Sequence, residues 1–212
     1  MRITVFGATG NVGRHVVAEA LERGHDVTAV TRDPARSADL PAAATARSGN
    51  AANADHVATL SAGQDLVISA TRPASGSEPE LVATAEALLD GLARTGVRLL
   101  LVGGAGSLIV PDTGGCLVDD PRYISAGFRD IALACCDQLE VCRVDTAVDW
   151  AYLSPPALLE PGDRTGRFRL GGDELLVDAA GRSGISVADL AVALLDEAER
   201  PRHRRARFTV AY

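Results

Sequence analysis

The sequence predicts a doubly wound α/β fold built on a mostly parallel sheet. Short apolar segments alternate with longer amphipathic ones, and the apolar segments are rich in Val, Ile and Leu without polar alternation. Strands of this kind are buried on both faces, which requires helices on both sides of a parallel sheet. At 212 residues, 47% of them hydrophobic, the chain is long enough to form such a core.

The first half of the chain sets the strand–helix period. The apolar stretches ITVF at 3–6 and DVTAV at 26–30 predict buried strands around an amphipathic helix at 12–23. The alternation then continues to residue 103. It predicts a weak strand at 44–49, a short helix at 53–60, a strand at 65–70, a helix at 78–94 and a strand at 97–103.

After Gly106 the alternation becomes less regular. Residues 110–123 carry turn signals over a long loop, and long loops in compact domains are usually functional or mobile. Beyond it we expect a helix at 125–142, a strand at 149–155, short strands around Phe168 and at 175–177, a helix from Ser186, and a last strand at 207–212. Ser186 is the expected N-cap of its helix, with Asp189 three residues later.

Composition and charge argue against several classes of function. A net charge of −7 disfavours a nucleic-acid surface, and we expect the basic segment 200–208 to be a solvated turn. No apolar run reaches the roughly 18–20 residues of a membrane span, and the N-terminus lacks a signal-peptide pattern, so we expect a cytoplasmic protein. The four cysteines and four histidines show no metal spacing, so we expect core cysteines and no metal site.

Three glycines separate the first expected strand from the first expected helix. Gly7, Gly10 and Gly13 have the spacing G-x-x-G-x-x-G. Glycines allow a tight turn and let the backbone approach a pyrophosphate, which then meets free N–H groups at the positive end of the helix. At the head of a βαβ unit this pattern strongly indicates a dinucleotide site, the alternative being a purely structural turn.

The residues after the second expected strand indicate which dinucleotide binds. An acidic residue there would bind the ribose 2′-hydroxyl of NAD, but Arg32 is the first side chain able to reach the ribose. Arg32 therefore predicts a 2′-phosphate and hence NADP. Asp33 leaves NAD open if the turn shifts by one residue, and Arg14 and Arg36 either assist or lie on the surface.

Four further segments follow the glycines in a recognisable order: TRDP, SATRP, LLVGGAGSL and DWAYLSPPALLEPG. With them the whole chain resembles the atypical short-chain dehydrogenase/reductases that have an NAD(P)H-binding Rossmann domain. Within that group it is similar to the small NADH-flavin reductases, relatives of biliverdin-IXβ reductase and of NmrA-like proteins. We expect a single domain over residues 1–212, in which about 155–212 contribute the substrate-side elements.

The resemblance implies a set of cofactor-binding residues at the ends of successive strands. Those at the pyrophosphate are Thr9, Gly10, Asn11 and Val12, within the glycine segment that also holds Gly7 and Gly13. Arg32 would bind the ribose phosphate and Asn50 would lie near the adenine. The others, towards the nicotinamide, are Ala70, Thr71, Arg72, Gly103, Gly104, Ser154 and Pro155. The alternative for Arg72 is that it is a surface residue that does not bind the cofactor. The alternative for Ser154 is that it belongs to a rigid strand exit.

Catalytic residues are predicted less directly. Typical members of the superfamily use a Tyr-x-x-x-Lys pair, but all 21 basic residues of this chain are arginine, so the pair is absent. Ser107 is placed to hydrogen-bond a substrate oxygen, and Tyr123 lies in the long loop that could cover the cleft. The alternative for Ser107 is a turn residue, and the alternative for Tyr123 is a hydrophobic anchor of the loop. Without a strong general acid, hydride transfer suits flavins or quinones, which take their proton from water.

Three functions are compatible with these features. The first is reduction of a small-molecule acceptor, with NADPH as cofactor and a flavin as the leading candidate. The second is a regulatory dinucleotide sensor of the NmrA type, and the third is an epimerase or isomerase with tightly held cofactor. We expect no nucleic-acid or membrane partner, and the oligomeric state is open between monomer and homodimer.

Overall fold

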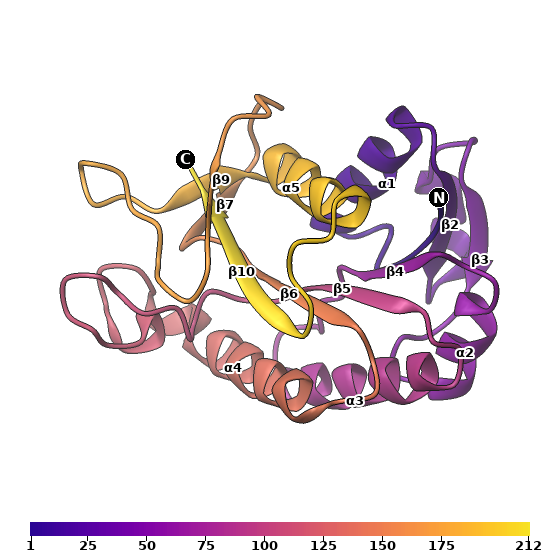
Figure 1. The fold of residues 1–212 in the computed structure, drawn as a ribbon, viewed down its shortest axis with the longest axis horizontal. Helices are drawn as coiled ribbons and strands as arrows, with labels where there is room; N and C mark the ends of the chain where they lie inside the picture. Colours follow the sequence, from indigo (N-terminus) through magenta and orange to yellow (C-terminus); the bar gives the residue numbers. More distant parts are fainter.

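One eight-stranded sheet forms the centre of the computed structural model, which describes residues 1–212 (Figure 1). Its strand order is β3-β2-β1-β4-β5-β6-β10-β8. Every neighbouring pair is parallel except β10 with β8, so the predicted mostly parallel sheet is confirmed. The order switches direction between β1 and β4, and ligands of open α/β sheets bind at such switch points, outside the carboxyl ends of the strands.

Through the fifth strand the elements alternate as the sequence predicts. They are β1 (Arg2–Phe6), α1 (Asn11–Glu22), β2 (Asp26–Thr31), the 3-10 helix η1 (Pro34–Asp39), β3 (Thr45–Ser48), α2 (Ala54–Ser61), β4 (Leu66–Ser69), α3 (Glu80–Ala93) and β5 (Arg98–Val102). The weak strand expected at 44–49 is present as β3, at the edge of the sheet.

The second half of the chain contains shorter elements. They are η2 (Leu117–Asp119), η3 (Ala126–Phe128), α4 (Arg129–Val144), β6 (Trp150–Ser154), β7 (Leu158–Glu160), β8 (Arg169–Gly171), β9 (Gly184–Ser186), α5 (Val187–Glu199) and β10 (Ala206–Ala211). The helix expected at 125–142 begins with the single turn η3 and continues as α4. None of the helices has the length and apolar character needed to cross a membrane.

Two features of the second half differ from the sequence prediction. The prediction of a strand at 175–177 is wrong, because these residues form no strand. Leu175 is instead buried with Leu108, Val110 and Leu117, and its N–H donates to the carbonyl of Ile109 at 2.8 Å. The apolar pattern at 175–177 is that of a strand, but these residues pack on a loop and do not join the sheet. The short parallel pair of β7 with β9 was not expected, because three residues give too little periodicity to detect.

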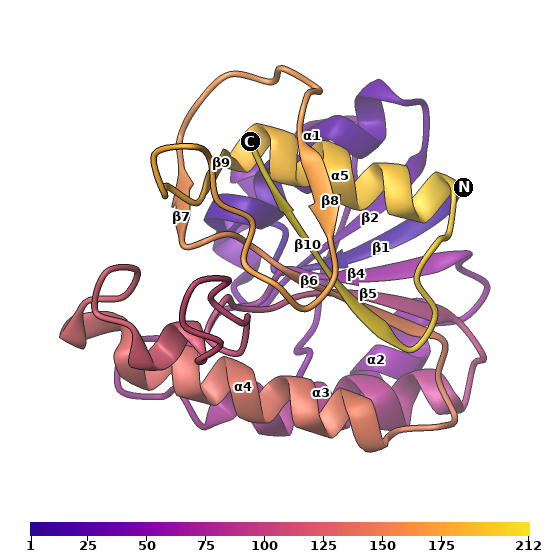
Figure 2. The same cartoon turned by 60° about the vertical axis from the view of Figure 1, so that its left-hand side comes forward.

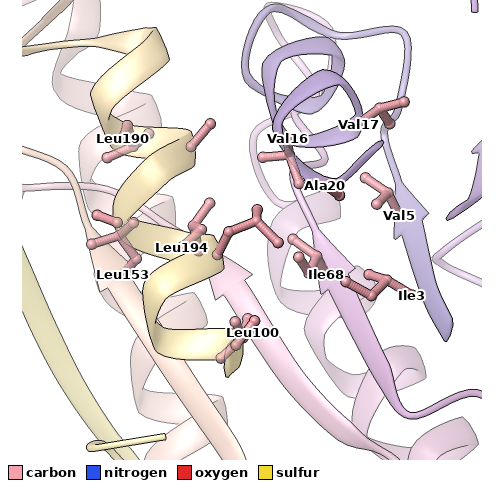
Figure 3. Packing of buried hydrophobic residues seen from close by; sticks show 14 of the residues in the cluster. Ile3, Val5, Val16, Val17, Ala20, Ile68, Leu100, Leu153, Leu190 and Leu194 are labelled. Carbon is pink, nitrogen blue, oxygen red and sulfur yellow. The ribbon is translucent and has the colours of Figure 1, made fainter. Parts of the chain in front are cut away.

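Helices cover the two faces of the sheet unequally. Figures 1 and 2 show α1 and α5 on one face and α2, α3 and α4 on the other. Alternate residues of each apolar strand point to opposite faces. Figure 3 shows part of the cluster on the first face, which includes Ile3, Val5, Val16, Val17, Ala20, Ile68, Leu100, Leu153, Leu190 and Leu194. The second face includes Phe6, Val67, Leu99, Leu101, Trp150 and Tyr152. Burial on both faces explains why the strands lack polar alternation.

A buried carboxylate holds the segment that follows β7. Asp189, at the start of α5, is fully buried and accepts hydrogen bonds from the N–H groups of Thr165 and Gly166 at 2.8 and 2.7 Å. The hydroxyl of Tyr212 donates to the same carboxylate at 2.8 Å. The expected capping contact is confirmed, since Ser186 Oγ accepts from the N–H of Asp189 at 3.0 Å. Asp189 therefore ties the loop after β7 to α5 and to the C-terminal residue.

This arrangement predicts acid-sensitive stability. Burial raises the pKa of Asp189, but the hydrogen bonds to its carboxylate outweigh burial and hold the pKa below its usual value. Such a group stabilises the fold above its unfolded pKa of about 3.9, and this contribution is lost as the pH falls through the folded pKa. Asp189→Asn is expected to lower the free energy of unfolding by about 2–4 kcal/mol at pH 7, and less below about pH 3.

Urea denaturation at pH 7 and at pH 3 measures this loss. Asp90→Asn, at an exposed position of α3, is the matched control and should change the free energy of unfolding by less than about 0.5 kcal/mol. Equal losses in the two variants at pH 7 would show that Asp189 does not hold the loop.

Candidate functional site

A cleft of about 930 Å³ lies at the carboxyl ends of the strands on both sides of the switch point. This volume is near the upper end of the range of about 300–1,000 Å³ for ligand sites. Figure 2 shows the loop after β5 and the β7 segment at this same end of the sheet. Most of the predicted site residues line the cleft: Gly7, Thr9, Gly10, Asn11, Val12, Arg32, Asn50, Ala70, Thr71, Arg72, Gly103, Gly104, Tyr123 and Pro155. Gly13, Ser107 and Ser154 do not.

The glycine turn brings α1 against the sheet as closely as backbone atoms permit. Gly7 has φ +77°, and a Cβ there would lie 2.5 Å from the carbonyl oxygen of Ala70. A Cβ on Gly13 would lie 2.0 Å from the carbonyl oxygen of Gly7. Gly13 therefore sets the packing of helix on strand rather than lining the cleft. The backbone of Ala70, predicted as a cofactor residue, lies against Gly7.

The N-terminus of α1 is open to an anion. Gly10 caps the helix without a side-chain hydrogen bond, and the N–H groups of Asn11, Val12 and Gly13 have no acceptor in the protein. Free N–H groups and the positive end of the helix dipole together form an anion-binding site. The geometry fits a pyrophosphate on residues 10–13.

Two arginines follow β2 and line the part of the cleft where the adenosine is expected. Arg36 Nη2 donates to the carbonyl of Thr9 at 2.9 Å and Nε lies 3.2 Å from Asp39. Arg32 lines the same wall and makes no ion pair. Asp33 Oδ1 accepts from the N–H of Ala35 at 2.9 Å and so caps η1. One oxygen of Asp33 is thus engaged locally, whereas the Arg32 guanidinium is available.

Asn50 and Thr71 extend the lining on either side of β1. Asn50 Oδ1 accepts from the N–H of Ala52 at 3.1 Å, which leaves its side-chain NH2 group free. Thr71 Oγ1 lies 3.1 Å from Ser69 Oγ. Arg72, exposed and without an ion pair, follows Thr71 in the wall of the cleft.

A buried tyrosine supports the strand end at Gly103 and Gly104. Tyr152 Oη donates to the carbonyl of Cys135 at 2.9 Å and accepts from the N–H of Gly104 at 3.3 Å. A Cβ on Gly103 would lie 1.8 Å from Tyr152 Cζ, so the tyrosine ring by itself requires glycine at this position. Burial raises the pKa of the Cys135 thiol to about 12, so this cleft-lining cysteine is protonated at neutral pH.

The wall of the cleft between residues 102 and 160 is largely apolar. It combines backbone of the β5 end with side chains of the following loop, α4 and β7. The larger apolar side chains after β5 are Leu117, Tyr123, Ile124, Phe128, Ile131, Pro155, Pro156, Leu158 and Leu159. Phe128 and Leu158 are 57% and 51% exposed, unusual for large apolar residues. Exposed apolar side chains at a cleft mark a surface that a ligand covers.

The predicted catalytic residues are placed differently from one another. Ser107 lies outside the cleft lining, and its Oγ accepts from Arg207 Nη1 at 2.8 Å, which links the loop after β5 to β10. Tyr123 lines the cleft, but its hydroxyl donates to the carbonyl of Gly181 at 3.2 Å. Ser154, predicted as a cofactor-binding residue, is buried and its Oγ has no partner. Catalytic roles for Ser107 and Tyr123 stay predictions.

Several residues of the apolar wall were not predicted. Phe128, Ile131 and Leu158 fall in segments that look like ordinary loop, helix and strand exit, and only the fold brings them together. The one sequence signal at Phe128 is that it is one of four phenylalanines in the chain and follows the long loop. Of the expected substrate-side stretch 155–212, only residues 155–160 line the cleft.

An open sheet of this strand order, with a glycine turn and an anion-binding helix end at its switch point, defines a Rossmann-type dinucleotide-binding protein. The chain belongs to the NAD(P)H-binding family, which it matches over residues 7–198. The predicted resemblance to atypical short-chain dehydrogenase/reductases is therefore confirmed.

Three solved structures illustrate the range of its relatives. A putative exported protein from Burkholderia pseudomallei is 40% identical with a TM-score of 0.89, covering 100% of both chains. A putative epimerase from Bacteroides thetaiotaomicron is 37% identical with a TM-score of 0.89, covering 100% of this chain and 96% of that one. A putative NADH-flavin reductase from Streptococcus pneumoniae TIGR4 is 32% identical with a TM-score of 0.85, covering 100% and 99%. The expected cytoplasmic location stays a prediction.

Proposed function

We propose that the protein is an NADPH-dependent reductase of a flat conjugated acceptor such as a flavin or a quinone. The observation that carries this proposal is the division of the cleft into two parts. One part offers helix N–H groups and free arginines to a dinucleotide, and the other offers apolar side chains to a ring. The putative NADH-flavin reductase from Streptococcus pneumoniae TIGR4, 32% identical to this chain, supports the same chemistry.

Preference for NADPH rests on the arginines after β2. Arg32 and Arg36 both line the cleft beside the expected position of the ribose, and Arg32 is not neutralised by an ion pair. A 2′-phosphate there would accept charge-assisted hydrogen bonds, each contributing about 1.5–3 kcal/mol. Asp33 supports NAD less well, because one of its oxygens already caps η1.

The residues of this chain contribute binding and orientation. When bound, NADPH supplies a hydride, and a proton from water completes the two-electron reduction of the acceptor. The flat floor at Gly103 and Gly104, held by Tyr152, leaves room for the nicotinamide, and the apolar wall excludes water from the ring beside it. Effective concentration of two well-oriented reactants supplies much of the acceleration without a strong general acid.

Anaerobic stopped-flow absorbance at 340 nm tests the proposal. NADPH and NADH are mixed in turn with riboflavin, FMN and a set of small quinones, and oxidation of NADPH by at least one acceptor is expected. Tight NADPH binding with no oxidation by any acceptor would favour the dinucleotide sensor. Substrate isomerisation with no net change at 340 nm would favour the epimerase, which the relative at 37% identity suggests and the missing Tyr-x-x-x-Lys pair disfavours.

The apolar wall predicts a specific effect for Phe128. Phe128 is 57% exposed in the cleft, so an aromatic acceptor is expected to bury its ring by stacking, and stacking and apolar burial together contribute about 1–2 kcal/mol. Phe128→Ala should raise the KM for riboflavin about five- to twentyfold while leaving the Kd for NADPH within about twofold. Val144→Ala, at an apolar residue 79% exposed outside the cleft, is the control. An equal KM in both variants would place the acceptor elsewhere.

A further inference from the structure

We propose that the acceptor is an uncharged ring, such as riboflavin or a neutral quinone, and that the site discriminates against the same ring when it carries a phosphate or another anionic group. This inference rests on the reductase function proposed above and specifies its substrate class. It follows from the distribution of charge along the cleft.

Positive charge is confined to the dinucleotide part of the cleft. The charged side chains that line it are three arginines and three carboxylates: Arg32, Arg36, Arg72, Asp33, Glu80 and Glu160. All three arginines follow β2 or β4. In the wall between residues 102 and 160, the one charged side chain is Glu160, a carboxylate.

Arginines close to this wall in the sequence are already paired with carboxylates. Arg122, beside Tyr123, contacts Asp112 at 2.6 Å and also pairs with Asp120. Arg129, beside Phe128, contacts Asp119 at 2.9 Å. Neither arginine lines the cleft. The apolar wall between residues 102 and 160 therefore has no free cation of its own.

Arg72 is the arginine of the cleft whose charge reaches the apolar wall between residues 102 and 160. Its charge acts to lower the pKa of the Cys135 thiol in that wall and that of the Glu78 carboxyl. The bound cofactor competes for the same charge. A 2′-phosphate carries about two negative charges, and a pyrophosphate adds one for each phosphate group.

The loaded cleft is consequently negative. Three arginines are balanced by three carboxylates before any ligand binds, and NADPH then adds about four negative charges. An acceptor that enters next to the bound cofactor meets a negative field within a Debye length of about 10 Å at 0.1 M salt. A neutral ring avoids this repulsion, whereas a phosphorylated one does not.

Two matched pairs of acceptors test the inference at saturating NADPH. Riboflavin and FMN share one ring and differ in a phosphate; 1,4-naphthoquinone and its 2-sulfonate form the second pair. At about 0.02 M salt, kcat/KM is expected to be about tenfold or more higher for the neutral member of each pair. The difference should narrow at about 0.5 M salt because the repulsion is screened.

Variants at Glu160 test the origin of the discrimination. Glu160→Arg should raise the ratio of kcat/KM for FMN to that for riboflavin about tenfold, and Glu160→Gln about threefold. Glu86→Arg makes the same charge change at an exposed position of α3 outside the cleft and should leave the ratio unchanged.

The outcomes separate this inference from the reductase proposal. Reduction of FMN as fast as riboflavin, or an unchanged ratio in Glu160→Arg, would overturn the neutral acceptor and leave the reductase standing. If no acceptor of either pair oxidises NADPH, the reductase proposal fails and the inference fails with it.

Discussion

Arg32→Ala is expected to weaken binding of NADPH by about 10- to 100-fold and to change binding of NADH by less than about threefold. The guanidinium of Arg32 lines the cleft after β2 without an ion pair, so removing it frees no carboxylate and exposes no buried charge. The loss then equals the contribution of a charge-assisted hydrogen bond, about 1.5–3 kcal/mol. NADH lacks the 2′-phosphate and has no corresponding contact to lose.

Arg36 provides an internal comparison. Its guanidinium already donates to the carbonyl of Thr9 and pairs with Asp39, so part of its capacity is used within the protein. Arg36→Ala is therefore expected to weaken NADPH binding by a smaller factor, about three- to tenfold, and to affect NADH slightly through the loosened turn at Thr9.

Titration of cofactor fluorescence gives both dissociation constants directly. Arg47→Ala is the matched control, since Arg47 is an exposed arginine on the neighbouring strand β3 and does not line the cleft. It should change the Kd of either cofactor by less than about twofold. Equal weakening of NADPH and NADH by Arg32→Ala would show that this residue does not contact the 2′-phosphate.

Local patterns were sufficient to predict the cofactor part of the fold. The strand–glycine–helix unit at residues 3–23 contains its own signal, because the tight turn, the helix N-terminus and the close packing depend on residues within one short segment. The capping of α5 by Ser186 was predictable for the same reason, since the contact to Asp189 spans three residues. Such features can be predicted from the sequence because every residue that forms them lies within one short segment.

The acceptor part depends on contacts between distant segments. Phe128 and Leu158 line one cleft although they lie 30 positions apart in the sequence, and the pairing of β7 with β9 that positions Leu158 extends over three residues. Ser107 shows the converse. Its place after the fifth strand suggested a site residue, but Arg207, 100 residues further along the chain, binds its hydroxyl. Sequence spacing alone contains no information about that arginine.

The largest structural effect is expected from Gly13→Ala. A Cβ at this position would lie 2.0 Å from the carbonyl oxygen and 2.7 Å from the carbonyl carbon of Gly7, both backbone atoms that no rotamer change can move. Helix α1 must therefore shift away from β1. Overpacking of a core costs about 1–3 kcal/mol when side chains can adjust, so we expect a loss of about 3 kcal/mol or more here.

The same displacement should abolish cofactor binding. The N–H groups of Asn11 and Val12 form the anion site at the start of α1, and a misplacement of about 1 Å is enough to lose about a hundredfold in a positioned site. We therefore expect Gly13→Ala to raise the Kd for NADPH and for NADH alike by at least about a hundredfold. This equal loss distinguishes it from Arg32→Ala, which affects NADPH selectively.

Thermal unfolding and cofactor titration together measure the two effects of Gly13→Ala. For a domain of this size, about 3 kcal/mol corresponds to a fall in Tm of roughly 6–12 °C. Gly172→Ala is the control, because a Cβ at exposed Gly172 would have no atom within 4 Å. A Gly13→Ala protein with the Tm and cofactor affinity of the control would mean that α1 does not pack on Gly7 as closely as the structure shows. Loss of binding at an unchanged Tm would instead place Gly13 in contact with the cofactor itself.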